Sequence, residues 1–77
     1  MLFRSARATK LDVVNHLKRI ERAFPTYAKL DEVLYSMGFH LNEMDRPSEA
    51  VDAYMRLVRK RPQSNFRPEA YLGIGSY

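Results

Sequence analysis

Hydrophobic residues recur along this chain at the spacing of amphipathic helices, and prolines mark where two of these helices end. Between Pro47 and Pro62, the apolar residues that share one helical face are Ala50, Val51, Tyr54, Leu57 and Val58. Proline is tolerated in the first turn of a helix but disrupts a helix interior. The pattern therefore predicts a short helix from about residue 47 to about residue 61.

A longer apolar stripe with a glycine in its middle precedes this helix. It runs from about residue 29 to about residue 44 and consists of Leu30, Val33, Leu34, Met37, Gly38, Leu41 and Met44. Glycine inside a helix costs roughly 1 kcal/mol relative to alanine, so we expect a neighbouring helix to approach closely at Gly38, and again at Gly75. Asp45-Arg46-Pro47 predicts a tight turn between the two antiparallel helices.

The whole pattern repeats after 37 residues. Phe24-Pro25 and Arg61-Pro62 end two short helices at this separation, and Gly38 and Gly75 share it. The apolar phases of the later short helix are occupied in the earlier one by Val13, Val14, Leu17 and Ile20. Thr9 and Asp12 predict a capping box at the start of the earlier helix. The predicted order is short helix, helix with glycine, short helix and the start of a second helix with glycine.

Composition restricts the class of protein. The chain has 77 residues, 45% hydrophobic and 29% charged, which is typical of one folded domain with a thin core. It lacks the run of about 20 apolar residues that a membrane span needs, and its first ten residues lack the apolar core of a signal peptide. Cysteine is absent, which excludes disulfides and thiolate chemistry in this chain.

These features resemble the tetratricopeptide-repeat family, whose unit is a helix with a bulky, a medium and a small residue, a turn, a helix with small and aromatic residues, and a proline. In this sequence those roles fall on Leu34, Met37, Gly38, Leu41, Ala50, Tyr54, Leu57 and Pro62. Three leucines among them replace the tryptophan, tyrosine and second small residue that the family often has. The next unit opens with Tyr71 and Ile74-Gly75 in the expected phases.

The resemblance implies an all-α fold of stacked antiparallel helical hairpins in a single domain, residues 1–77. Residues 1–27 would be the second half of one repeat, 28–64 a complete repeat and 65–77 the start of a further repeat. The chain is then expected to be a fragment of a larger repeat protein. Its long connections resemble those of bacterial cell-envelope members, of the Tol-Pal-associated and outer-membrane assembly lipoprotein kinds, which suggests the periplasm or cell envelope.

The resemblance also implies where a partner binds. On the glycine-bearing helix, Glu32, Tyr35, Phe39 and Asn42 form a second line beside the main stripe. In tetratricopeptide repeats this side lines a concave groove that binds a peptide or partner protein, and Leu72 and Ser76 would extend it. The alternative is that both aromatic residues of the line pack within the array or against another copy.

The sequence offers little for catalysis. His40 and Glu43 stand one turn apart, but a zinc site normally needs three or four protein ligands. Gly73-Ile74-Gly75 lacks the strand and later glycine of a dinucleotide site and is interpreted as helix packing. No histidine stands at a plausible spacing from a serine in the repeat. We expect no enzymatic activity, no metal site and no cofactor.

The net charge of +4 supports a rival function. Basic residues gather in the first 29 positions and again at 56–61: Arg4, Arg7, Lys10, Lys18, Arg19, Arg22, Lys29, Arg56, Arg59, Lys60 and Arg61. One positive edge built from them would bind nucleic acid or anionic lipid through phosphates. The alternative is that these residues satisfy helix C-termini and solvent.

The ends of the pattern predict self-association. Tyr71, Leu72 and Ile74 have little to pack against, and repeat arrays normally need at least three units. We therefore expect the exposed terminal faces to pair with a second copy.

Overall fold

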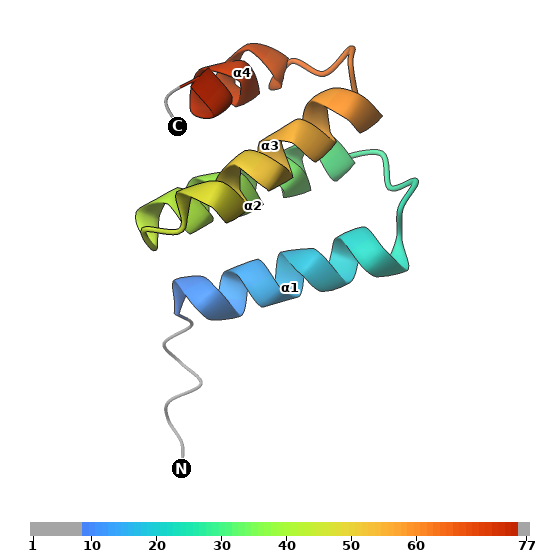
Figure 1. Ribbon diagram of the computed structural model, residues 1–77. Coiled ribbons are helices and arrows are strands. Elements are labelled where there is room, and N and C mark those ends of the chain that lie inside the picture. The colour runs from blue at the N-terminus through green and yellow to red at the C-terminus, as the bar shows by residue number, and fades with distance from the viewer. Residues whose placement is uncertain (1–8, 76–77) are drawn as a thin grey trace.

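The computed structural model describes residues 9–75, which form four α-helices and no strand (Figure 1). The helices are α1 (Lys10–Ala23), α2 (Leu30–Glu43), α3 (Pro47–Lys60) and α4 (Arg67–Gly75). The predicted all-α class is confirmed, whereas a superhelical stack of the tetratricopeptide kind stays a prediction. Within the described residues no helix is both long and apolar enough to cross a membrane.

The 37-residue repeat of the sequence is also a repeat of the backbone. α3 begins and ends 37 residues after α1, and α4 begins 37 residues after α2. The C-caps of α1 and α3 have nearly the same dihedral angles, with φ and ψ of −131° and 68° at Phe24 and of −133° and 67° at Arg61. Each cap donates its N–H over 2.8 Å, from Phe24 to Ile20 O and from Arg61 to Leu57 O. The two connecting segments are therefore built alike.

The turn between α2 and α3 reverses the chain within three residues. Asp45 has a φ of 61°, in the left-handed region that aspartate tolerates better than most residues. Arg46 N donates to Leu41 O over 2.9 Å and Asp45 N donates to Asn42 O over 3.1 Å, the pattern of a Schellman motif. Pro47 then opens α3, as the sequence predicts.

The capping box predicted for α1 is present. Asp12 N donates to Thr9 Oγ1 and Thr9 N donates to Asp12 Oδ2, each over 3.1 Å. These two bonds satisfy backbone donors that the first turn of a helix leaves open.

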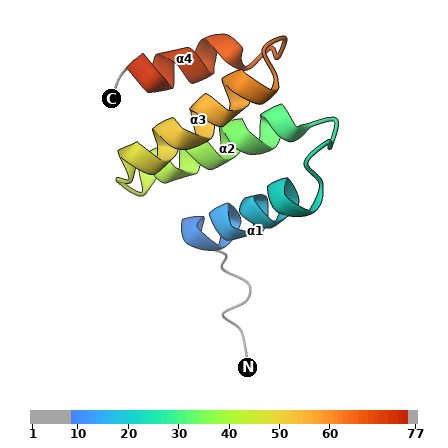
Figure 2. The ribbon, with the colours of Figure 1, turned by 45° about the vertical axis from the view of Figure 1, so that its right-hand side comes forward.

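The helices stack in an order that follows the chain. α2 packs between α1 and α3, and α4 packs against α3 (Figures 1 and 2). All four helices contribute to one buried cluster: Val14, Leu30, Val33, Leu34, Met37, Leu41, Ala50, Ala53, Tyr54, Leu57 and Ala70. The predicted repeat-packing residues of α2 and α3 belong to it, except Gly38, which is itself buried. Three other residues of the predicted apolar faces are only partly buried: Met44, Val51 and Val58. Pro62 is exposed and directly follows the C-cap of α3, where it prevents the helix from continuing.

Tyr54 of α3 lies between two glycines on the flanking helices. A Cβ built on Gly38 of α2 would stand 2.6 Å from Tyr54 Cζ, and one on Gly73 of α4 would stand 2.7 Å from Tyr54 Cδ2. Both distances are far inside van der Waals contact, so the ring fits only because these two positions lack a side chain. The close approach predicted at Gly38 is confirmed.

The same prediction for Gly75 is wrong within residues 9–75, because apart from its chain neighbours and the backbone of its own helix nothing there lies within 4 Å of a Cβ at this position. Gly75 has the register of Gly38, but the described part of the chain contains no counterpart of α3 to press against it. Gly73 makes the close contact instead, at a position where α2 has Ser36.

Candidate protein-binding surface

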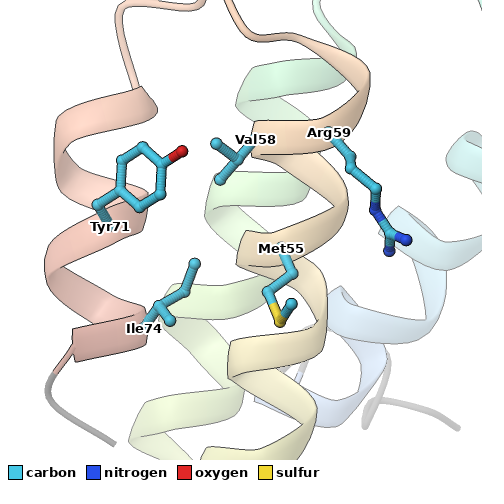
Figure 3. Close-up of a pocket in the computed structure, with 5 residues that line it drawn as sticks. All are labelled: Met55, Val58, Arg59, Tyr71 and Ile74. Carbon is cyan, nitrogen blue, oxygen red and sulfur yellow. The ribbon is translucent and has the colours of Figure 1, made fainter.

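One apolar hollow lies between α3 and α4, and we call it the α3–α4 groove. It has a volume of about 380 Å³ and is lined by Met55, Val58, Arg59, Tyr71 and Ile74. Figure 3 shows Tyr71 and Ile74 of α4 reaching toward Val58 and Met55 of α3, whereas Arg59 points away from α4. The groove is therefore an apolar surface with its one charged side chain at the edge.

The register of the repeat identifies what kind of surface this is. Tyr71 and Ile74 of α4 stand 37 residues after Leu34 and Met37 of α2. Leu34 and Met37 are 0% exposed, because α3 packs over α2, but Tyr71 is 50% exposed. The α3–α4 groove therefore lies over α4 in the same position that α3 occupies over α2.

α1 carries a second open apolar surface, which we call the α1 outer face. Ile20, Phe24 and Tyr27 line a hollow of about 330 Å³ there. Phe24 is 61% exposed and Tyr27 is 44% exposed. Sequence reasoning assigned neither residue to a site, although both stand on a side of α1 that no other described helix covers.

A polar cluster joins α1 to α3. Arg56 of α3 donates two hydrogen bonds to Glu21 of α1, from Nε to Oε2 over 2.8 Å and from Nη2 to Oε1 over 3.0 Å. Lys60 Nζ lies 3.6 Å from Glu21 Oε2, and Arg56 also pairs with Asp52. Burial raises the pKa of Glu21, but the hydrogen bonds and charge of Arg56, together with Lys60, outweigh it and hold the pKa below its usual value of 4.5.

The residues predicted to line a concave groove, which we call the concave line, are Glu32, Tyr35, Phe39 and Asn42 of α2, with Leu72 and Ser76 as its extension. One of its two aromatic side chains packs against other rings, and the other faces outward. The Tyr35 ring stacks on Phe66 with centroids 4.9 Å apart and lies 5.9 Å from the Tyr54 ring. Tyr35 is half-buried, whereas Phe39 is 46% exposed and meets only the edge of the His40 ring among described aromatic residues. Packing within the array, the alternative weighed for both residues, thus applies to Tyr35.

The other members of the predicted groove lie at the surface or outside the described residues. Glu32 and Asn42 are exposed, and Leu72 of α4 is 72% exposed. Burial and the nearby Tyr35 raise the pKa of Tyr54, and a side-chain hydrogen bond with Asn42 lowers it in part. Asn42 therefore already serves the α2–α3 pair. Ser76 lies outside the described residues.

Many of the basic residues that suggested a phosphate-binding edge have partners within the chain. Lys10 Nζ lies 3.4 Å from Glu43 Oε1, and Arg61 Nη2 donates to Tyr27 O over 2.7 Å. Arg56 and Lys60 are held by Glu21. Lys18, Arg19 and Arg22 line a shallow hollow on α1, while Arg4 and Arg7 lie outside the described residues. Much of the positive charge is thus held by contacts within the chain or lies on one side of α1, while Arg59 stands at the edge of the α3–α4 groove.

The described residues contain no group of three or more histidine, cysteine, aspartate or glutamate side chains that could hold a metal ion. Glu43, paired with Lys10, is one of the two residues considered as ligands. Comparison of the chain with protein-family models, curated proteins and solved structures gave no match.

Proposed function

We propose that this protein is a non-catalytic protein-interaction module of the tetratricopeptide-repeat kind. One observation carries the proposal: Leu34 and Met37, which α3 covers completely on α2, recur on α4 as Tyr71, which is 50% exposed, and Ile74, which is only partly buried. A groove of apolar side chains with a charged edge is the usual site for an amphipathic helix of a partner.

The repeat indicates the chemistry of that helix. α3 covers α2 with a face of two alanines, a tyrosine and a leucine, namely Ala50, Ala53, Tyr54 and Leu57, all of which are buried. The small residues let the helix axes approach closely, and the large ones fill the space between them. A partner helix with small residues and one or two bulky ones therefore fits the α3–α4 groove.

The concave line offers the same function a second surface. Phe39 and Leu72 are the large apolar residues of that line with high exposure, at 46% and 72%. An extended peptide lying across α2 and α4 would cover both side chains, and Glu32 would favour a peptide with a positive charge. The contribution of Tyr35 is limited to the part of its ring that Phe66 leaves open.

A designed helix tests the proposal without knowledge of the natural partner. The probe is a fluorescent, stapled helix of about 15 residues that presents alanine, alanine, tyrosine and leucine at the spacing of the α3 face. Every protein tested carries Phe24→Asp on the α1 outer face, so that copies of the chain do not compete for the groove. We expect fluorescence anisotropy to show saturable binding that Tyr71→Asp weakens at least about tenfold, because a carboxylate is then buried in the groove.

Leu72→Asp is the matched control, because Leu72 neighbours Tyr71 on α4 and does not line the groove. It should leave the affinity for the probe within about twofold, as expected for a surface substitution away from the contact. Circular dichroism must show the same helicity for all variants. The proposal fails if the probe does not bind, or if Tyr71→Asp and Leu72→Asp affect binding equally.

A further inference from the structure

We infer that the α3–α4 groove binds α1 of a second copy of this chain, so that copies associate head to tail. This inference rests on the proposed function and names its partner. α1 is the residue-for-residue counterpart of α3, 37 positions earlier. Placed over α4 of another copy, α1 would stand where the next helix of the repeat belongs.

The second copy is favoured first by the state of α1. Val13, Leu17 and Ile20 are the counterparts of Ala50, Tyr54 and Leu57, three of the four buried residues of α3. The counterpart of the fourth, Ala53, is His16, which is exposed. Val13, Leu17 and Ile20 are only half-buried in this chain, because α1 packs on α2 and meets α3 at the polar cluster around Glu21, whereas α3 packs on both α2 and α4. Among residues 9–75, no helix covers the α3–α4 groove over α4, and none covers the α1 outer face. Each supplies what the other lacks.

The second argument compares a polar contact inside the chain with the residues at the corresponding positions of the two open surfaces. Inside the chain, Lys60 of α3 lies 3.6 Å from Glu21 of α1. Across the proposed contact the corresponding residues are Ala23 of the second copy and Val58 of the first, so both members of the ion pair are replaced by apolar residues. No charge is left buried without a partner at this point.

A second polar pair is replaced in the same way. Ser64 Oγ donates to Asp31 Oδ2 over 2.5 Å at the end of the α2–α3 pair. The corresponding residues across the proposed contact are Tyr27 of the second copy and Pro68 of the first. Tyr27 lines the hollow of the α1 outer face, so Pro68 of the first copy is an apolar residue that this hollow can receive. The two open surfaces are complementary to each other at positions where the interior of the chain uses polar contacts.

The glycine of α4 fits the same arrangement. Gly75 has open space around it and stands in the register of Gly38, against which the Tyr54 ring packs. Leu17 is the counterpart of Tyr54, so Leu17 of the second copy would pack over Gly75. Arg19, the counterpart of Arg56, would face Val58 and can extend its charged end to solvent along that side chain.

Such a contact joins two different surfaces, so it is heterologous and leaves both ends of a dimer able to bind further copies. We expect sedimentation of the wild-type chain to show a mass that rises with concentration beyond that of a dimer, between about 5 and 500 µM, where weak interfaces populate complexes. Tyr71→Asp blocks the groove and Phe24→Asp blocks the α1 outer face. Each variant alone should be monomeric, with association weakened at least about tenfold.

A mixture of the two variants decides the matter. Phe24→Asp retains an intact groove and Tyr71→Asp retains an intact α1 outer face, so together they should form a one-to-one dimer that grows no further. If Phe24→Asp alone still dimerises, the contact joins two like surfaces and the inference is wrong. A wild-type chain that stays monomeric throughout the range also refutes it. Binding of the designed helix in that case would leave the proposed function standing and exclude only the second copy as occupant.

Discussion

α2 and α4 carry the same pattern of residues in different surroundings. In α2, Leu34 and Met37 are completely buried beneath α3, and Gly38 receives the Tyr54 ring. In α4, Tyr71 is half-exposed and Gly75 receives nothing among the described residues. The repeat therefore determines which face of each helix is apolar, whereas the next helix of the stack determines whether that face is buried. Burial in a repeat is therefore a property of pairs of helices.

The largest effect is expected from shortening the bulky side chain at the position that α2 and α4 share in the repeat, which is Leu34 in α2 and Tyr71 in α4. Leu34→Ala should lower the free energy of unfolding by about 2–5 kcal/mol, because it leaves a cavity in a fully buried cluster. Tyr71→Ala should lower it by no more than about 1 kcal/mol, since half of this side chain is exposed and only its contacts with Arg67 and the groove are lost. Urea unfolding followed by circular dichroism measures both, at a protein concentration low enough to avoid association and with sucrose added to keep the weaker variant folded. Equal losses would contradict the comparison.

A smaller effect of opposite sign is expected at the two glycines. Gly38→Ala should destabilise the fold by about 1–2 kcal/mol, because the new Cβ meets the Tyr54 ring and overpacking exceeds the gain in helix propensity. Gly75→Ala should be neutral or should stabilise by up to about 1 kcal/mol, because its Cβ meets nothing and alanine favours the helix. The same unfolding experiment distinguishes them. Two changes of the same sign would mean that the ring does not fix the position of α2.

Much of the fold was predictable because its signals are local. The capping box at Thr9, the helix start at Pro47 and the glycine at 38 each depend on residues within a turn or on one spacing repeated along the chain. The apolar register that places Tyr71 at an open end follows from the same repeat. The 37-residue period identified the positions at which α2 and α4 differ.

The features that were missed depend on contacts between helices. Gly73 breaks the register of the repeat, so only the position of α4 beside Tyr54 reveals its role. Tyr35 is placed on the concave line by its phase, but Phe66 in the following connection stacks on it. Phe24 and Met55 are exposed on surfaces that no described helix covers, and their own sequence phase does not indicate this. Arg56 and Glu21 are 35 residues apart in the sequence, and nothing in either helix alone indicates that they pair.

The smallest effect concerns the polar cluster, which is present between α1 and α3 and replaced by Val58 at the α3–α4 groove. Because the pKa of Glu21 is lower in the folded chain than its usual 4.5, its ionised form stabilises the fold above that value. The stabilisation is lost as pH falls through the lowered pKa, when the carboxylate is protonated and its bonds to Arg56 weaken. Glu21→Gln should therefore cost about 1 kcal/mol at neutral pH, a typical net value for a hydrogen-bonded pair at the edge of the core. The difference in stability between wild type and Glu21→Gln should vanish on acidification.

Glu49→Gln is the control, since Glu49 lies 3.9 Å from Arg46 with both side chains nearly half-exposed, and it should change stability little at any pH. A wild-type advantage over Glu21→Gln that persists below pH 3 would show that the carboxylate is not what joins α1 to α3, because a glutamate whose charge matters cannot keep its effect once it is neutral.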